Sequence, residues 1–412
     1  MGSLFLELVP VSEAAARLER FAPIDRRESV PLAAAAGRVV GRALTAPEAL
    51  PPFDRSLMDG YAVRAADAAA ARETAPVFLT VTGEVQMGQP AAGTLGPGQA
   101  MAVPTGGMLP AGADAVVMIE HTRELPDGRI EVLRSVAGGQ HVLPAGDDIT
   151  AGATLLEAGH RVAALDLGAL AAGGVCSIEV FEQPRVTILS TGDELVAPEE
   201  RPAPGQVRDT NAVTLAAQVA SAGGRARIAG RVADDRAALL AATEAAQQEA
   251  DLVLLSGGSS VGARDHTARV LRELSGGELL LEGIAISPGK PTLVATVGGV
   301  PLIGMPGHPV SSFVVFQVVI APLLRRRGGE LRPPLRPRVR GRLTANAPAA
   351  PGRETWLRVR LQPNAGGPPA VVPVPGSSAV YASLLGSDGL LCIPAEREGF
   401  ARDEEVEVEV LR

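Results

Sequence analysis

The sequence predicts a multi-domain α/β protein with a central doubly wound α/β domain, a helical segment, an inserted β domain and a C-terminal β domain. Its 412 residues exceed the roughly 100 to 200 residues of one domain. From Pro184 onward, short apolar runs alternate with segments of helical periodicity, which is typical of a parallel α/β sheet. Elsewhere, short alternating runs lie between many of the 47 Gly and 34 Pro, which indicates β modules.

The opening segment has a helical pattern. Ser12 is a suitable N-cap for a helix over 14–21, and we expect an extended piece at 29–32 and a second helix near 33–43. The apolar spacing of Val162, Leu165, Leu167 and Leu170 restores a helix later in the chain. Residues 1–46 and 146–182 are therefore predicted to form one helical domain.

Residues 47–145 interrupt that domain and are predicted to form an inserted β domain. Four short runs have strand character and are separated by Gly and Pro. They cover 77–81, 99–103, 115–119 and 129–133. A chain that leaves a helical layer, makes a β module and returns indicates an insertion.

Residues 183–328 are predicted to form the α/β domain. The expected strands cover 186–189, 225–229, 252–255, 293–296 and 301–303, and the expected helices cover 211–222, 235–250, 266–274 and the run after Pro309. Asp209 or Thr210 can cap the first helix, and Asp234 or Asp235 the second. A linker over 325–337 precedes a C-terminal β domain at 329–412, whose segments include 354–360 and 405–411.

Charge and hydropathy exclude two classes of partner. The net charge of −8 gives no general attraction to nucleic acid. The longest apolar stretch, 311–324, contains Gln317 and Pro322 and is shorter than a membrane span, so no membrane is expected. Charged residues interrupt the N-terminal segment, and two Cys are too few for a disulfide framework, so we expect a cytoplasmic protein.

Three predicted strands end in glycine-rich loops. Ligands of doubly wound sheets bind at the carboxyl ends of strands, where backbone amides can contact phosphate, so these loops should converge on one edge. No nucleotide-binding pattern of the G-x-x-x-x-G-K-[ST] or G-x-G-x-x-G type occurs there. The loops are 190–194 with Thr191 and Gly192, 256–262 with Ser256, Gly257, Gly258, Ser260 and Gly262, and 304–309 with Pro306 and Pro309.

Carboxylates accompany these loops, and one cation stands apart. Several acids beside a phosphate cradle can hold Mg²⁺, although each alone could be a helix cap. These acids are Asp193, Glu194, Asp234 and Asp265. Lys290, the single lysine in a chain whose other cations are Arg, lies in the turn Ser287-Pro288-Gly289-Lys290-Pro291, which suggests a need for a compact charge.

Taken in order, the motifs resemble the molybdopterin molybdenumtransferase family, which is related to the C-terminal domain of gephyrin. Each motif is weak alone, but together they span most of the chain. They are 58–63 (Met-Asp-Gly-Tyr-Ala-Val) after 53–56, Thr105-Gly106, 146–149, 190–195, Asp209-Thr210-Asn211, the Ser-Gly-Gly and Ser-Val-Gly of 256–262, 288–291 and 306–311.

The resemblance implies a central domain of the molybdopterin-binding type and a homodimer. In the family, the cleft lies between the α/β domain of one subunit and the inserted β domain of its partner. This implies that Asp59 and Thr105 face Glu194, Asp234 and Asp265 of the other subunit. Without such a role, the loop that carries Asp59 would be only a capped turn with Tyr61 packed beneath it.

The implied reaction inserts molybdenum from molybdate into adenylylated molybdopterin and releases AMP. Mg²⁺ on Glu194, Asp234 and Asp265 would offset the diphosphate charge, and Asp59 would be an acid, a base or a metal-positioning group. Lys290 would contact phosphate, Ser256 to Gly258 would offer amides, and Pro306 to Ser311 would receive the oxyanion. An adenylyltransferase is a possible partner that supplies the substrate.

The sequence departs from the family at several positions. Many members have Lys or Gln where Ser287 stands, a basic cluster at 142–145, Val where Ser259 stands and Asn where His308 stands. Fewer cations leave open a preference for tungstate or a weakly active paralogue. Two other functions also remain as alternatives, a molybdopterin adenylyltransferase and a non-catalytic scaffold, although the extra domains and the acidic loops argue against each.

Overall fold

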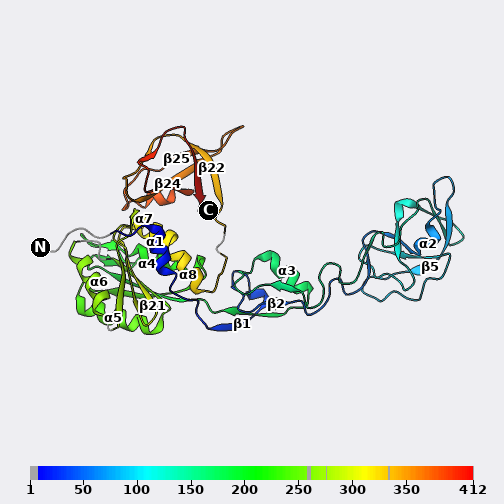
Figure 1. Ribbon diagram of the computed structural model, residues 1–412, viewed down its shortest axis with the longest axis horizontal. Helices are drawn as coiled ribbons and strands as arrows, with labels where there is room; N and C mark the ends of the chain where they lie inside the picture. Colours follow the sequence, from blue (N-terminus) through cyan, green and yellow to red (C-terminus); the bar gives the residue numbers. More distant parts are fainter. Residues whose placement is uncertain (1–7, 258–260, 275, 333–334, 412) are drawn as a thin grey trace.

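The computed structural model describes residues 8–257, 261–274, 276–332 and 335–411, with the backbone alone at 261–265. The molecule is elongated (Figure 1). The α/β domain and the C-terminal β domain lie together at one end, and the inserted β domain lies at the other. An arm that contains β1, β2 and α3 connects the two ends. The predicted multi-domain α/β fold class is confirmed.

The α/β domain is built on a mixed sheet of six strands. Their order is β16 (Arg225–Val232), β13 (Arg185–Thr191), β17 (Leu252–Gly257), β21 (Val300–Met305), β20 (Leu293–Val297) and β18 (Gly277–Glu282). The first four strands are parallel, as predicted. The prediction is wrong for β20, which runs antiparallel to β21, because Gly298 and Gly299 form a two-residue hairpin turn with φ of +56° and +81°. β18, which was not predicted, pairs antiparallel with β20 and so runs in the same direction as the first four strands.

Helices cover both faces of this sheet. On one face lie α4 (Thr210–Ser221) and a continuous helical run of α7 (Pro309–Val315), the π-turn η3 (Phe316–Ile320) and α8 (Ala321–Arg327). On the other lie α5 (Arg236–Glu249) and α6 (Val261–Glu273). Asp209 and Asp235 cap α4 and α5 by accepting from the backbone N–H of Ala212 and Ala238.

The run Pro309–Arg327 is long and apolar enough to cross a membrane, but most of its apolar window is buried within the molecule, as in a core helix. Because α8 continues to Arg327, the linker predicted from residue 325 begins only after this helix.

The first helix belongs to the core of the α/β domain. α1 (Val11–Leu18) buries Ala14 and Leu18 against that core, together with Val9 and Phe21. It begins directly after Pro10 and has no side-chain cap, so the prediction of Ser12 as N-cap was wrong.

The arm is mainly a set of antiparallel ladders. β1 (Arg27–Pro31) pairs with β12 (Ser177–Phe181), β2 (Leu44–Thr45) pairs with β11 (Thr154–Leu156), and α3 (Ala164–Ala172) packs beside them. The helix predicted near 33–43 was wrong, since only the 3-10 turn η1 (Leu32–Ala34) forms. Gly37 has φ +76° and Val40 bridges to Val180, so this segment joins the ladder instead.

The inserted domain is a second six-stranded sheet. Its order is β7 (Ala115–Met118), β4 (Gly60–Val63), β6 (Gln99–Val103), β5 (Val77–Glu84), β9 (Arg129–Val132) and β8 (Thr122–Glu124). The short pair β3 (Arg55–Ser56) and β10 (Val142–Leu143), the helix α2 (Ala65–Ala68) and the turn η2 (Ile119–His121) complete it. The family motif at 58–63 was expected on a loop, but its second half forms β4, which is buried between two neighbours.

The C-terminal domain is a third sheet, and it borrows one strand. Its order is β19 (Ile286–Ser287), β24 (Glu354–Gln362), β25 (Ala370–Pro373), β22 (Arg338–Leu343), β28 (Glu405–Val410) and β26 (Gly389–Ile393), with β24 also paired to β26. The pair β23 (Ala347–Pro348) and β27 (Gly399–Phe400) and the helix α9 (Ala382–Leu385) complete it. Since β19 comes from the turn before Lys290, this sheet is joined to the α/β domain at the predicted phosphate loops.

Candidate functional site

The three strands that lead into the glycine-rich loops end side by side at the carboxyl edge of the α/β sheet. β13 pairs with β17 as far as Thr191 and Gly257, and β17 pairs with β21 as far as Ser256 and Met305. Because the three strands are parallel neighbours, the loops that follow them leave the sheet at the same edge. The structure thus brings together the strand ends at Thr191, Gly257 and Met305.

One buried side chain bridges two of these loops. The Asn211 amide donates to Ser256 Oγ at 3.1 Å and to the Gly307 carbonyl at 2.9 Å. Asn211 and Ser256 are 8% and 2% exposed, so the bond between them is buried, and the bond to Gly307 is partly buried. In the sequence, Asn211 belongs to the motif Asp209-Thr210-Asn211, but nothing in that motif predicted a role for its side chain.

The end of β13 carries two hydroxyls that are available to a ligand. Ser190 Oγ and Thr191 Oγ1 are buried and have no hydrogen-bond partner among the residues that the structure describes. Unpaired buried polar atoms are unusual, which indicates a ligand or water at this edge. Gly192 follows with φ +145°, and a Cβ there would lie 2.6 Å from Glu194 Oε2, so only glycine lets this carboxylate fold back over the turn.

Gly257 makes the second tight turn. It has φ +124°, and a Cβ there would lie 1.9 Å from the Thr191 carbonyl oxygen. The first two loops can approach each other only because residue 257 is glycine. Of the other residues predicted in this loop, Gly262 lies in the first turn of α6, while Gly258, Ser260 and the Asp265 side chain lie outside the described residues.

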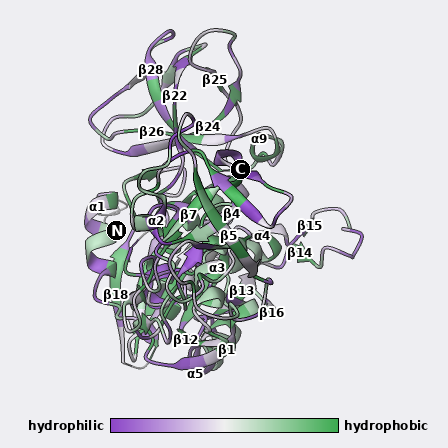
Figure 2. Ribbon diagram, turned by 90° about the vertical axis from the view of Figure 1, so that its right-hand side faces the viewer, coloured by the Kyte–Doolittle hydropathy of each residue, from purple (hydrophilic) through white to green (hydrophobic). Residues whose placement is uncertain are grey.

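Of the predicted carboxylates, Asp193 and Asp234 are joined by a hydrogen bond, whereas Glu194 is exposed and takes no part in it. Asp193 Oδ1 accepts from the Asp234 backbone N–H at 3.1 Å, and Asp234 Oδ1 is buried without a partner. Glu194 is exposed and precedes β14 (Leu195–Val196), which pairs with β15 (Val207–Arg208) in a projection from the domain that is visible in Figure 2. Among the side chains that the structure describes, no three His, Cys, Asp or Glu form a metal-binding group.

Lys290 lies on a turn that packs against α7. The Lys290 side chain is half-buried and has no hydrogen bond or ion pair with any residue in the described ranges. A Cβ on the preceding Gly289 would lie 2.4 Å from Val315 Cγ2, which shows how closely the turn and the helix approach. Pro306 is buried, Pro309 begins α7, and Ser311 is 5% exposed in its first turn.

The C-terminal domain adds side chains that the sequence analysis did not select. The Ser378 carbonyl accepts from the Val310 N–H at 3.0 Å, and His308 Nδ1 lies 2.8 Å from Ser378 Oγ. Arg358 is 5% exposed, donates to the Gly376 carbonyl at 2.6 Å and has a pKa lowered by burial. No motif indicated this loop, because its contact with α7 depends on how the two domains dock.

In the inserted domain, Asp59 and Thr105 form a pair. Asp59 Oδ1 accepts from the Thr105 N–H at 2.7 Å and from Thr105 Oγ1 at 3.0 Å. Both residues are exposed, and these two hydrogen bonds, the backbone bond first, lower the pKa of Asp59. The carboxylate is therefore held ionised without being buried.

A single chain does not bring this pair to the α/β sheet. The sheet that contains β5 and its neighbours lies at the opposite end of the molecule from the sheet that contains β21 (Figure 1). Asp59 and Thr105 therefore do not meet Glu194 and Asp234 within one chain.

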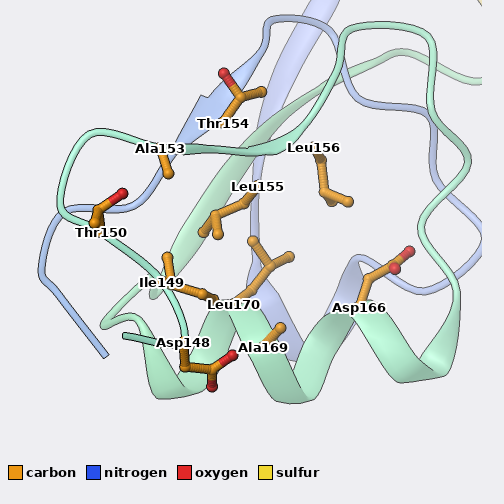
Figure 3. Close-up of a pocket in the computed structure, with 10 residues that line it drawn as sticks. All are labelled: Asp148, Ile149, Thr150, Ala153, Thr154, Leu155, Leu156, Asp166, Ala169 and Leu170. Atoms are coloured by element: carbon orange, nitrogen blue, oxygen red, sulfur yellow. The ribbon is translucent and has the colours of Figure 1, made fainter. Parts of the chain in front are cut away.

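A cavity of about 370 Å³ lies in the arm between β11 and α3 (Figure 3). Its lining is largely apolar, with Asp148 and Asp166 among the lining residues. Burial raises the pKa of Asp166, but bonds from the Ala163 N–H and from His160 outweigh burial and lower it. None of the predicted site residues lines this cavity, so it is separate from the sheet edge.

Comparison with known proteins decides the family. Three sequence families match in order: the MoeA N-terminal region (domains I and II) at 9–174, a probable molybdopterin binding domain at 187–326 and the MoeA C-terminal region (domain IV) at 340–411. The molybdopterin molybdenumtransferase 2 of Mycobacterium tuberculosis is 36% identical over 380 residues, covering 89% of this chain and 91% of the relative. The chain belongs to the molybdopterin molybdenumtransferase family.

Further relatives agree with this membership and confirm the resemblance that the motifs suggested. The molybdopterin molybdenumtransferase of Nostoc sp. is 37% identical over 305 residues, covering 73% of this chain and 70% of the relative. The crystal structure of the molybdopterin biosynthesis MoeA protein from Pyrococcus horikoshii OT3 has a TM-score of 0.85 at 32% identity and covers 98% of this chain and 100% of that chain. The chain is thus an enzyme, a transferase of molybdenum cofactor biosynthesis.

Proposed function

We propose that this enzyme inserts molybdenum from molybdate into adenylylated molybdopterin and releases AMP. The observation that carries the proposal is that the three strands leading into the glycine-rich loops end at one sheet edge, beside the hydroxyls of Ser190 and Thr191, which have no hydrogen-bond partner among the described residues. The names of the relatives support molybdopterin as the acceptor. Cleavage of an activated phosphoanhydride would drive the metal insertion.

The sheet edge offers donors suited to a diphosphate. The tight turn at Gly257 would allow backbone amides to approach phosphate oxygens, and the Ser256 hydroxyl lies beside it. The unpaired Lys290 ammonium, on a turn against α7, would supply a compact positive charge. Together these groups would bind the phosphates without a generally basic surface.

At the positions where the sequence departs from the family, cations near the expected oxyanion position are missing. The structure has another cation, Arg358, beside the loop that contacts the start of α7. Arg358 reaches the loop at Gly376, two residues before Ser378, which contacts the start of α7. Its Nε is buried without a partner. We infer that Arg358 and the segment Pro306 to Ser311 receive molybdate. Whether tungstate can replace molybdate is tested by the same assay.

Mg²⁺ fits the acidic part of this edge. Mg²⁺ in phosphate sites usually binds one or two carboxylates and takes its other ligands from phosphate and water. Asp234 has a buried Oδ1 without a partner, so it is the first candidate ligand, with Glu194 and Asp265 as further ones. When bound, Mg²⁺ would offset negative charge on the diphosphate. Asp193 would hold the Asp234 backbone in place through its hydrogen bond.

A homodimer would complete the site. Because Asp59 and Thr105 lie far from the α/β sheet of their own chain, they could face Glu194 and Asp234 only from a second subunit. An ionised Asp59 would then act as a base or position the metal. We propose a cytoplasmic enzyme, supplied with its substrate by an adenylyltransferase partner.

The test is AMP release from adenylylated molybdopterin in the presence of Mg²⁺ and molybdate. We expect release that depends on molybdate and that Asp59→Ala and Glu194→Ala each reduce by about 100-fold or more, the typical contribution of one acid–base group. Glu199→Ala, an exposed acid of the β14–β15 projection, is the matched control and should keep full activity. If the intact protein released no AMP with either molybdate or tungstate, the proposal would be wrong and a scaffold would be the better account.

A further inference from the structure

The side chain of Asn211 is placed to control two loops at once. Its Nδ2 atom donates one hydrogen bond to Ser256 Oγ at 3.1 Å and one to the Gly307 carbonyl at 2.9 Å. A carboxamide nitrogen carries two hydrogens, so both of its donors are used, one on each loop. The residue is 8% exposed, which leaves little access for water to replace either bond.

Hydrogen bonds at the start of α4 fix the backbone position of Asn211. Asn211 is the second residue of α4, and Asp209 holds the start of the helix by accepting from the Ala212 N–H at 3.1 Å. The Asp209 N–H in turn donates to the Val196 carbonyl at 2.8 Å. The carboxamide therefore projects from a capped helix start, and the loops are held against it.

We propose that Asn211 is a positioning residue that keeps the Ser256 and Gly307 loops in register for the phosphate groups of the substrate, an inference that rests on the proposed function. Because Ser256 Oγ accepts from Asn211, its own hydrogen is left to donate to a phosphate oxygen. The structure gives that hydroxyl no other acceptor among the described residues. The same amide holds the Gly307 carbonyl and so fixes the turn that leads into α7.

The residue type matters for this role. Aspartate has the same shape but can only accept when ionised, so it would take up the Ser256 hydrogen and repel the Gly307 carbonyl. Alanine would leave both acceptors without a donor. We therefore expect both Asn211→Asp and Asn211→Ala to break the hydrogen bonds to the two loops. Because aspartate keeps the volume of asparagine, similar effects of the two variants would show that lost volume alone is not the cause.

A matched control lies on the same helix. Gln218 is 7% exposed, and its Oε1 accepts from Gln317 Nε2 at 2.9 Å, away from the loops. Gln218→Ala therefore removes a buried carboxamide of α4 without touching the sheet edge.

The first measurement is amide hydrogen exchange of the folded protein without substrate. We expect peptides that cover 256–257 and 304–308 to exchange about tenfold faster in both Asn211 variants, as for a local opening that has become easier. Gln218→Ala should leave these peptides unchanged. Unaltered exchange in the Asn211 variants, or equal acceleration in Gln218→Ala, would overturn the inference.

The second measurement is binding of inorganic pyrophosphate, followed by the kinetics of AMP release. We expect pyrophosphate to bind about tenfold more weakly to both Asn211 variants and the KM of the substrate to rise by a similar factor, with a smaller change in kcat. Faster amide exchange combined with unchanged pyrophosphate affinity would contradict the proposed role of Asn211 in substrate binding. If the parent protein released no AMP, the proposed function would fail, while the exchange result would still decide the role of Asn211.

Discussion

Asp59 shows how an exposed carboxylate can be kept ionised by geometry alone. It has no cation among its hydrogen-bond partners, and both bonds come from Thr105, one from the backbone and one from the hydroxyl. The backbone donor persists in any variant, but the hydroxyl can be removed. Thr105 therefore controls how far the pKa of Asp59 is lowered.

Thr105→Val should shift the acid limb of the pH–activity profile to higher pH. With one of the two stabilising bonds gone, the pKa of Asp59 rises, so the carboxylate becomes protonated at a higher pH and activity is lost earlier on acidification. The profile of AMP release checks this, and Thr105→Ser, which keeps the hydroxyl, is the control. Superimposable acid limbs for Thr105→Val and the parent would contradict it.

Lys290→Met should weaken phosphate binding without affecting folding. The ammonium group has no partner in the described part of the chain, so its loss breaks no internal bond. We expect pyrophosphate to bind about tenfold more weakly, which corresponds to about 1.4 kcal/mol. Isothermal calorimetry and the thermal midpoint check the two parts, and a large fall in the midpoint with unchanged affinity would assign Lys290 a structural role instead.

At the level of elements, sequence patterns predicted what depends on local periodicity. The parallel strands and the capped helices α4 and α5 of the α/β domain were predicted close to their observed limits. Their signals are local, because Asp209 and Asp235 cap N–H groups three residues away and a buried strand is a short apolar run. The helix expected at 33–43 failed because its alanines favour helix locally, whereas pairing with β12 favours an extended chain. β4 was missed because a four-residue strand has no measurable period.

The candidate site followed the same division. Its glycines and acids could be chosen from sequence, since they follow predicted strands. The bridge from Asn211 to Gly307 and the contact of Ser378 with Val310 could not be predicted. Each joins residues that are far apart in the sequence, 96 positions in the case of Asn211 and Gly307, and tertiary packing decides that they meet. The cavity beside α3 likewise depends on how β11 closes over a helix.

The close approach of the ends of β13 and β17 makes Gly257 the most restrictive of the loop glycines that the structure describes. Gly257→Ala should lower the thermal midpoint by several degrees, because its Cβ would collide with the Thr191 carbonyl and residue 257 would also keep a φ that favours glycine. Gly230→Ala is the control. Gly230 has φ +103° in β16 of the same sheet, but nothing lies within 4 Å of a Cβ there, so only the backbone cost of about 1 kcal/mol remains. Equal midpoints for the two variants would show that the collision is relieved by a shift of β13.

For the whole molecule, the junction between arm and α/β domain depends on Asp251. This carboxylate is 5% exposed, accepts two bonds from Arg26 and is also bonded by the Arg185 N–H. Burial alone would raise its pKa, but these bonds outweigh burial, and the pKa of Asp251 is lowered. Arg26 belongs to the segment that leaves α1, so the cluster ties the start of the arm to the sheet.

Asp251→Asn should flatten the acid dependence of stability. Because the folded pKa is lowered, the stabilisation is present above the unfolded value of 3.8 and is lost as the pH falls through the folded value. At pH 7 the variant should lose roughly 1–3 kcal/mol, less than for a fully buried pair because Arg26 is partly exposed. Unfolding midpoints from pH 7 down to pH 3 check this, with the exposed Glu199→Gln as control. A variant with the same acid limb as the parent would contradict the assignment.

A composite dimer site predicts complementation between inactive subunits. When Asp59→Asn and Glu194→Gln subunits are mixed equally and allowed to exchange, half of the dimers are mixed, and each has one intact site out of two. Recovery of about a quarter of the parent activity is therefore expected for a two-fold symmetric dimer. Each variant alone gives the baseline. No recovery, despite proven subunit exchange, would place all the reacting groups within one chain.

The docking of α1 against the α/β sheet has a consequence for biosynthesis. Val9, Ala14, Leu18 and Phe21 leave the ribosome before the arm and the inserted domain, yet their partners in the core begin at Val186. At about 5–20 residues per second, the roughly 160 intervening residues take on the order of ten seconds or more to translate. During that time the arm and the inserted sheet can fold, while the apolar face of α1 stays uncovered on the nascent chain. The α/β domain is therefore completed only after the arm and the inserted domain, although its α1 residues precede both in the chain.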